Sequence, residues 1–405
     1  MKIWLINHYA VPPQFYPLAR PSLFAKNLIK MGHDVTIIAA STVHNSDKNL
    51  ITDNEKVKKF TDDGIPYILI KCSGYKGNGA KRVINILEFA QKLPKVMNTL
   101  ERPDAIVATS FDPFTCYEGI KYAKKHGIKA VAEIADLWPE TLVAISGISP
   151  KNPFVKYLRK IEKNIYTTAD RVVYTMEGAY DYIIEQGWEK IVPRDKVEFI
   201  NNGIDLDEFD FNVKHNQIED EDLEDPDTFK VVYAGAIRKV NNVMMLVDAA
   251  VELDSSVQFL IWGDGDQLEE IRDIVKEKNI KNVKLKGRVQ KKYVPFITSK
   301  ADLNIIHGEE SPVIRFGMSL NKMFDSMAAG RVILVDIHSP YDPAVDCGAA
   351  IECKNDSHSI AEAIKRIVKM EPKERNRREQ AARQGAEKYD FKYLTSKLVD
   401  VIQHI

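Results

Sequence analysis

Three absences narrow the class of this chain. Its 405 residues include only four cysteines, with no CxxC or Cys/His pattern, so neither a zinc site nor a disulfide framework is indicated. No stretch approaches the roughly 18–20 apolar residues of a membrane span, and the apolar run after Met1 ends at His8 and two prolines, as in a buried strand rather than a signal peptide. The net charge of −1 excludes a polycation that binds nucleic acid. We therefore expect a cytoplasmic protein.

The order of the apolar runs predicts two α/β domains. Hydrophobic residues make up 44% of the chain, which is enough for two cores. In the first half, helical patterns such as 22–31 and 153–168 alternate with strands expected at 2–7, 35–40, 105–109, 130–134, 171–175 and 197–200. After an acidic stretch at 214–228, which we interpret as a solvated linker or surface loop, strands are expected at 230–234, 257–262, 283–286, 303–306, 332–335 and 349–353. Such alternation is typical of parallel sheets with helices on both faces.

Ligands of open α/β sheets bind beyond the carboxyl ends of the strands, so the loops that follow the strands are the candidate sites. The loop after 230–234 holds Gly235, Arg238, Lys239 and Asn241 before a helix begins, and cations beside a helix start suit a phosphate. A plain turn with surface cations is the alternative.

The next two loops carry weaker signals. Gly263 and Gly265 follow a strand, but they also fit an ordinary turn, and the third glycine of a dinucleotide fingerprint is missing, which argues against a dehydrogenase. After Gly287, exposed backbone at Arg288 and Val289 could contact the edge of a base.

The most informative stretch is 317–330, which we interpret as a loop and a helix. Helix-start N–H groups with Ser319, Asn321 and Lys322 suit a diphosphate, and Asp325 could accept hydrogen bonds from ribose hydroxyls. Core packing by Met323, Phe324 and Met327 on the same helix is compatible with this site. The residues expected to contact such a nucleotide ligand are Gly317, Met318, Ser319, Leu320, Asn321, Lys322 and Asp325.

Two further stretches are candidates. Glu133, Asp136 and Glu140 gather at the end of one expected strand, where they form either an active site or a set of caps and surface charges. Asn202 lies in a tight turn that could act only as a hinge. The stretch 81–95 is apolar and basic, so it predicts either a helix that lies on an anionic membrane or one that packs on its own domain.

Taken in order, these segments resemble the family-4 glycosyltransferases, and most closely the bacterial members that build surface polysaccharides, including the N-acetyl-fucosamine transferase type. The segments are Asn7-His8-Tyr9 with Arg20-Pro21, 75–79 (Tyr-Lys-Gly-Asn-Gly), 136–140 (Asp-Leu-Trp-Pro-Glu), 202–205 (Asn-Gly-Ile-Asp), 263–265 and 321–330. The resemblance implies the GT-B fold, with two Rossmann-like domains facing across a cleft. Residues 1–205 would form the acceptor domain, 206–389 the nucleotide-sugar domain, and a last helix at about 390–405 would cross back to the first.

The resemblance also implies roles for individual residues. Arg238 and Lys322 would act on the leaving phosphate and Asp136 at the reacting sugar or acceptor, without a metal or another cofactor. Asp325 matches the second glutamate of the family's Glu-seven-residues-Glu motif, but Gly317 stands at the first, so backbone at 317–319, Glu309 or Glu310 would have to contact the sugar. Val243 stands where the family has a lysine. The acceptor side would comprise Arg20, Tyr75, Lys76, Asn78, Glu133, Glu140 and Asn202.

The expected activity is retaining transfer of a hexosyl or N-acetylhexosaminyl group. The donor would be a nucleotide-diphosphate sugar, UDP by default, and the acceptor a lipid-linked or carbohydrate hydroxyl in bacterial surface polysaccharide synthesis. The first domain would make peripheral contact with the inner face of the plasma membrane during this reaction. A nucleotide-sugar epimerase of the same fold and a non-catalytic nucleotide-sugar-binding protein remain the alternatives.

Overall fold

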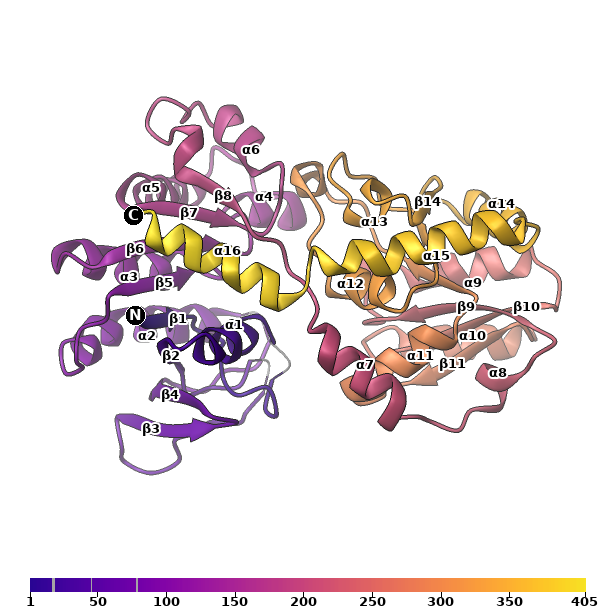
Figure 1. Ribbon diagram of the computed structural model, residues 1–405, viewed down its shortest axis with the longest axis horizontal. Helices are drawn as coiled ribbons and strands as arrows, with labels where there is room; N and C mark the ends of the chain where they lie inside the picture. Colours follow the sequence, from indigo (N-terminus) through magenta and orange to yellow (C-terminus); the bar gives the residue numbers. More distant parts are fainter. Residues whose placement is uncertain (17–18, 45, 78) are drawn as a thin grey trace. The chain divides into compact units, whose positions relative to one another are not determined.

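The computed structural model describes residues 1–16, 19–44, 46–77 and 79–405, which divide into two compact units. Unit 1 comprises Met1–Asn201 with Phe391–Ile405, and unit 2 comprises Asn202–Asp390 (Figure 1). Each unit is built on a single sheet with helices on both faces, so the predicted α/β class with two Rossmann-like domains is confirmed. Among the described residues, no helix has the length and apolar character needed to cross a bilayer.

The sheet of unit 1 has the order β3-β4-β2-β1-β5-β6-β7-β8, and all neighbouring strands are parallel except β3 and β4. Buried β-branched and aliphatic residues fill the central strands, as a sheet covered on both faces requires. The strands are β1 (Lys2–Ile6), β2 (Asp34–Ala40), β3 (Val57–Asp62), β4 (Ile65–Ile70), β5 (Ala105–Thr109), β6 (Lys129–Ile134), β7 (Arg171–Tyr174) and β8 (Val197–Phe199).

The β3–β4 hairpin was not predicted. Its turn residues Asp63 and Gly64 have φ values of 46° and 75°, as a type I′ turn requires at both central positions. The hairpin adds an antiparallel edge strand with no fully buried residue, on which Lys58, Lys59 and Thr61 are exposed.

Helices cover both faces of this sheet. In Figure 1, α1 and α16 lie on one face, where Phe391, Leu394 and Leu398 of α16 join the core formed with α1. The other face carries α2, α3 and α5. Asp112 and Asn152 accept hydrogen bonds from backbone N–H groups at the starts of α3 and α5, each of which has proline in its first turn. The helices are α1 (Ala19–Lys30), α2 (Ala80–Met97), α3 (Pro113–Lys125), α4 (Glu140–Ser146), α5 (Pro153–Thr168), α6 (Ala179–Glu185) and α16 (Phe391–Gln403), with a 3-10 turn, η1, at Arg194–Lys196.

The sheet of unit 2 is entirely parallel, with the order β11-β10-β9-β12-β13-β14. The order reverses between β9 and β12, so the loops after these two strands leave the sheet at its switch point. The strands are β9 (Phe229–Ala234), β10 (Val257–Trp262), β11 (Val283–Gly287), β12 (Leu303–Ile306), β13 (Val332–Val335) and β14 (Ala350–Glu352).

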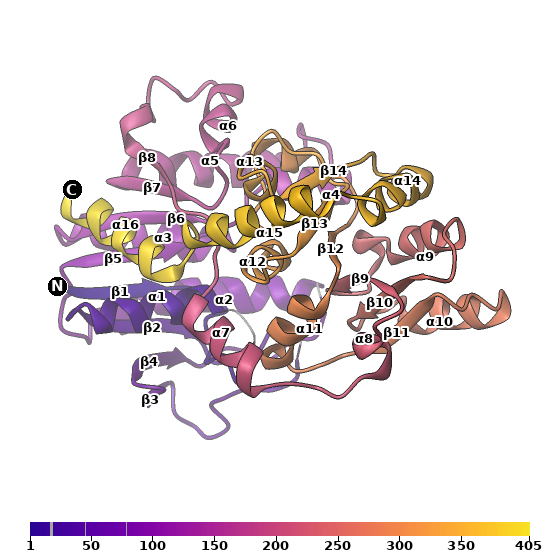
Figure 2. The ribbon, with the colours of Figure 1, turned by 45° about the vertical axis from the view of Figure 1, so that its right-hand side comes forward.

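Unit 2 buries separate cores on its two faces. One is formed with α9, α10 and α14, and the other with α7, α11, α12 and α15, of which α12 and α15 pack side by side in Figure 2. The helices are α7 (Leu206–His215), α8 (Glu221–Glu224), α9 (Val243–Val251), α10 (Leu268–Glu277), α11 (Val294–Lys300), α12 (Asn321–Ala328), α13 (Pro343–Asp346), α14 (Ser357–Val368) and α15 (Pro372–Glu387), with 3-10 turns η2 (Lys239–Asn241), η3 (Lys291–Tyr293) and η4 (Pro312–Phe316).

The acidic stretch at 214–228 packs against the sheet rather than forming a wholly solvated linker. Asp220 and Asp222 accept hydrogen bonds from the ammonium group of Lys286 on β11, at 2.7 and 2.6 Å. Leu223 of α8, directly after Asp222, is buried. The stretch therefore covers the edge strand of unit 2.

Candidate functional site

The loops after β9 and β10 interlock at the switch point of unit 2. A Cβ atom on Gly263 would lie 1.8 Å from the carbonyl oxygen of Gly235, and one on Gly265 would lie 2.1 Å from that of Ile237. The Ile237 N–H donates to the carbonyl of Asp264 at 3.0 Å. Glycine is therefore required at 263 and 265 by the approach of one loop to the other, independently of any ligand.

The loops after β9 and β11 each present an arginine without a partner among the described residues. Arg238 precedes η2 and is exposed, and its guanidinium has no hydrogen bond or ion pair to any described residue. Asn241 ends η2, and Asn242 turns into α9 with a φ of 44°. Arg288, after β11, is also exposed without a partner in the part of the chain that the structure describes, whereas the neighbouring Val289 packs on the α8–α11 core.

The stretch 317–320 leads into α12, whose N-terminus has no side-chain cap. Gly317 has a φ of 126°, a conformation that disfavours a side chain there. Met318 is buried, with its N–H donating to the carbonyl of Tyr341 at 3.3 Å. No side chain caps the N-terminus of α12 at Leu320, and the Asn321 side chain is exposed. The uncapped N–H groups of this helix can bind an anion.

Lys322 lies in the first turn of α12. Its ammonium group donates to the carbonyl oxygen of His307 and lies 4.9 Å from the centre of the Tyr233 ring. Burial lowers the pKa of Lys322 to about 8, an effect that the charge of Asp336 partly offsets. No carboxylate forms an ion pair with Lys322 among the described residues, so its charge is available to an anion.

Asp325 lies one turn further along α12, and burial raises the pKa of its carboxyl group. It lines a small cavity of about 10 Å³ together with Lys322, Thr298 and Asn304. This volume is roughly that of one water-sized probe, so the cavity beneath α12 is closed to a nucleotide, and a donor would have to bind on the outer side of these residues.

His307 and Asp336 hold three loops of unit 2 together. The Nδ1 atom of His307 lies 2.5 Å from Oδ2 of Asp336, and both side chains are fully buried. Its Nε2 atom lies 2.9 Å from the carbonyl oxygen of Asn242, and because that oxygen can only accept, Nε2 must donate. The pair thus joins the loops after β9, β12 and β13 directly behind Lys322.

In unit 1, Asp136 follows β6 and is half-buried. Burial raises its pKa to about 6, although the nearby Arg82 acts in the opposite direction. Arg82 of α2 donates to the hydroxyl of Tyr9 at 3.1 Å. His8 lies 2.7 Å from Oδ1 of Asn85, also on α2. The first turns of α2 therefore contact the loop after β1.

Arg20 and Glu133 meet beneath the surface of unit 1. The Arg20 guanidinium donates to Glu133 at 3.0 Å and to the carbonyls of Ile200 and Asn201, and the two side chains are 6% and 5% exposed. Thr109 donates to the second carboxylate oxygen of Glu133 at 2.7 Å. These contacts give both residues a structural role.

The other candidates are dispersed. Glu140 accepts from Arg159 at 2.7 Å, the Tyr75 hydroxyl lies 2.6 Å from Nδ1 of His44, and Lys76 is exposed. Asn202 belongs to unit 2, where its side-chain amide donates to the carbonyl of Ser319 at 2.9 Å. Asn78 lies outside the described residues.

Sequence reasoning did not place His307, Asp336 or Arg82 among the site residues, and it named Tyr9 only within a segment that carries the family resemblance. His307 and Asp336 each directly follow an entirely buried strand, β12 and β13, so a polar residue at the carboxyl end of a buried strand was the available signal. No group of three or more His, Cys, Asp or Glu side chains among the described residues could hold a metal ion.

Two family models match the chain. Glycosyltransferase Family 4 matches residues 23–208, and Glycosyl transferases group 1 matches residues 215–385. No curated protein sequence matches the chain significantly.

Several solved structures are similar over the whole chain. Sucrose-phosphate synthase from Thermosynechococcus elongatus is 15% identical, with a TM-score of 0.73 and coverage of 100% of this chain and 98% of that one. The Anabaena protein HepE, in complex with UDP and glucose, is 13% identical, with a TM-score of 0.68 and full coverage of both chains. A glycosyltransferase from Rickettsia africae is 16% identical, with a TM-score of 0.69 and coverage of 100% and 98%. The fold is therefore GT-B.

Proposed function

Since the chain belongs to glycosyltransferase family 4, we propose that it transfers a sugar, with retention at the anomeric carbon, from a UDP-sugar to a lipid-linked or carbohydrate hydroxyl. The family makes the chain a transferase. The base, the acceptor, the stereochemistry and a role in bacterial surface polysaccharide synthesis are the proposal. The complex of the similar HepE with UDP supports the choice of base.

One observation carries the donor site: Lys322 lacks a carboxylate partner among the described residues and lies at the uncapped start of α12. When the bond between the sugar and the β-phosphate breaks, negative charge develops on the phosphate. Lys322, Arg238 and the N–H groups near Ser319 would stabilise that charge more in the transition state than in the ground state. Asp325 would accept hydrogen bonds from the ribose, and the loops at Gly235, Gly263 and Arg288 would border the nucleotide.

The sugar would be bound without the glutamate that the family has at position 317. Of the two carboxylates considered instead, Glu310 forms an ion pair with His338 at 3.1 Å. Glu309 is exposed, and its carboxylate has no partner among the described residues. We therefore favour Glu309, together with backbone at 317–319, as the contact to the sugar hydroxyls.

The acceptor would bind to unit 1, beside Asp136. Its hydroxyl oxygen would attack the anomeric carbon from the face that the phosphate leaves, while the bond from that carbon to the phosphate oxygen breaks and the hydroxyl proton passes to the phosphate. Asp136 would orient the acceptor or stabilise positive charge at the sugar ring. The reaction would take place in the cytoplasm, at the inner face of the membrane where the acceptor is lipid-linked.

The test combines product analysis with matched variants. Arg238→Ala and Lys322→Ala should each lower turnover with UDP-sugars by about a hundredfold or more while circular dichroism stays unchanged. Lys281→Ala, which removes an exposed lysine away from these loops, should keep wild-type turnover. Near-normal rates in both site variants would remove the proposed phosphate site.

The same assay separates the alternatives. Conversion of the donor sugar without any acceptor would indicate an epimerase. A UDP-induced rise in melting temperature without turnover over an acceptor panel would indicate a binding protein.

A further inference from the structure

One face of unit 1 exposes apolar side chains on three neighbouring helices. On α2, Ile84 and Leu87 are 57% and 44% exposed, and on α5, Phe154 and Tyr157 are 49% and 54% exposed. The members of each pair are three positions apart, so they lie on the same side of their helix. The helix α3 packs between α2 and α5. A cluster of exposed large apolar residues marks an interaction surface for a protein, a ligand or a membrane.

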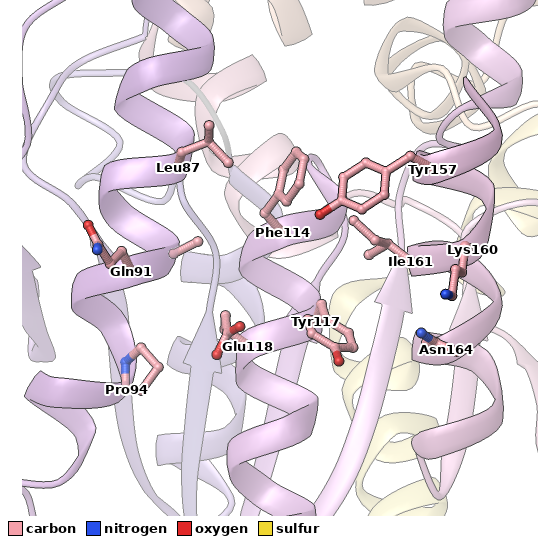
Figure 3. A pocket seen from close by; sticks show the side chains of 11 residues that line it. Leu87, Gln91, Pro94, Phe114, Tyr117, Glu118, Tyr157, Lys160, Ile161 and Asn164 are labelled. Atoms are coloured by element: carbon pink, nitrogen blue, oxygen red, sulfur yellow. The ribbon is translucent and has the colours of Figure 1, made fainter. Parts of the chain in front are cut away.

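The three helices enclose an open groove of about 530 Å³ (Figure 3). Phe114 and Tyr117 of α3 form its middle, between Leu87 of α2 and Tyr157 of α5. The rings of Phe114 and Tyr157 are 6.5 Å apart. All three helices thus contribute apolar side chains to the groove, which is also lined by Gln91, Glu118, Lys160 and Asn164.

The same helices are strongly basic. Together, α2, α3 and α5 contain eleven lysines and arginines but only three acidic residues, in a chain whose net charge is −1. The three acidic residues already pair with cations of their own helices: Glu88 with Lys92, Glu118 with Lys121 and Glu162 with Arg159. Exposed cations with no acidic partner among the described residues remain on α2 and α5, and they include Lys81, Lys95, Lys156 and Lys160, of which Lys160 lines the groove.

The apolar residues lie at the N-terminal ends of these helices. Helices that follow parallel strands begin at the carboxyl edge of the sheet, which is the edge that bears Asp136. From the first turns of α2, Arg82 and Asn85 contact Tyr9 and His8, while Ile84 and Leu87 of the same turns are exposed. The apolar face is therefore within one or two helical turns of the proposed acceptor loops.

We propose that the exposed face of α2, α3 and α5 docks on an anionic lipid bilayer, with hydrocarbon entering the groove between the helices. A surface that lies in the interface of an anionic membrane typically combines exposed apolar side chains with lysines, as these helices do. The inference rests on the proposed function in one respect: a bilayer at this place would present a lipid-linked acceptor to the carboxyl edge of the sheet.

The test is co-sedimentation of the full chain with vesicles of phosphatidylcholine, with and without phosphatidylglycerol. The wild-type chain should bind the vesicles that contain phosphatidylglycerol, bind less at 0.5 M salt, and not bind pure phosphatidylcholine. The double variant Ile84→Gln, Leu87→Gln should lower the partition coefficient at least about tenfold. The matched control is Val251→Gln on α9 of unit 2, which replaces an equally exposed apolar residue (60%) and should bind like wild type.

Three outcomes overturn the proposal: no binding to the anionic vesicles at low salt, binding that the double variant retains, or self-association that the double variant abolishes in a chain that does not bind vesicles. The last outcome would identify a protein interface. A UDP thermal shift on the same samples reports the donor site separately, so loss of vesicle binding with an intact shift leaves the transferase proposal standing.

Discussion

Cations near the carboxyl edges of the two sheets differ in the groups that they bind. In unit 1, Arg20 and Arg159 are bound to the carboxylates Glu133, Glu140 and Glu162. In unit 2, Arg238 is exposed, and Lys322 is bound only to a carbonyl oxygen. Both units have the same architecture, but these two arginines of unit 1 hold its own loops, whereas Arg238 and Lys322 of unit 2 have no carboxylate partner among the described residues.

This difference indicates which ligand each unit suits. A cation without a carboxylate, next to free N–H groups of a helix, favours a multiply charged anion such as a diphosphate. Paired cations and a half-buried carboxylate, Asp136, favour a neutral ligand with hydroxyl groups that can donate to it. The comparison supports a donor site in unit 2 and an acceptor site in unit 1.

The largest effect expected from this comparison is on stability. Arg20→Leu leaves the Glu133 carboxylate buried without its partner, so the free energy of unfolding of unit 1 should fall by about 3–5 kcal/mol. Arg238→Leu, at an exposed position, should change it by less than about 0.5 kcal/mol. Urea unfolding followed by circular dichroism measures both.

The double variant Arg20→Leu, Glu133→Gln provides the control. It removes both charges and should recover part of the lost stability. An Arg20→Leu protein as stable as wild type would show that the buried pair does not hold unit 1 together, and the contrast between the units would fail.

The next effect concerns pH. Because burial lowers the pKa of Lys322 to about 8, the lysine loses its charge as pH rises through this value, and a bound diphosphate would restore it. The affinity for UDP should therefore fall about tenfold between pH 7 and pH 9, with uptake of up to one proton per UDP bound at the higher pH. Titration calorimetry in buffers of different ionisation enthalpy measures the uptake.

Lys322→Arg is the matched variant, since arginine stays protonated over this range. The pH dependence and the proton uptake should both disappear in it. If wild-type protein binds UDP equally well at pH 7 and pH 9, Lys322 does not contact the phosphates.

The strands of both sheets could be predicted because their apolar runs are bounded by polar loops; the positions predicted for β5, β10, β12 and β13 match the observed bounds. The β3–β4 hairpin was missed although Asp63-Gly64 between two β-rich runs is a strong turn signal. The hairpin was not predicted because β3 contains two lysines, which an exposed edge strand tolerates.

The contacts that define the site could not be predicted from the sequence. Arg20 and Glu133 are 113 positions apart, and His307 contacts Asp336 and Asn242, which belong to two other loops. A pattern can place a polar residue at the end of a strand, but only the order of the strands decides which loop ends meet. The sequence left a ligand contact and an ordinary turn open for the glycines at 263 and 265, and the close approach of the two loops requires glycine there in either case.

The smallest effect expected tests how unit 2 holds its anion-binding loop. The Asn202 amide donates to the carbonyl of Ser319, just before α12. Asn202→Ala removes one hydrogen bond, worth about 1 kcal/mol, from the ordered loop, so the affinity for UDP should fall about fivefold while turnover at saturating donor changes little. Asn216→Ala, which removes an amide hydrogen bond to Asn212 at the C-terminal end of α7, should leave UDP binding unchanged. Equal affinities for wild type and Asn202→Ala would show that the loop is ordered without this contact, and that α12 alone presents its free N–H groups to the phosphate.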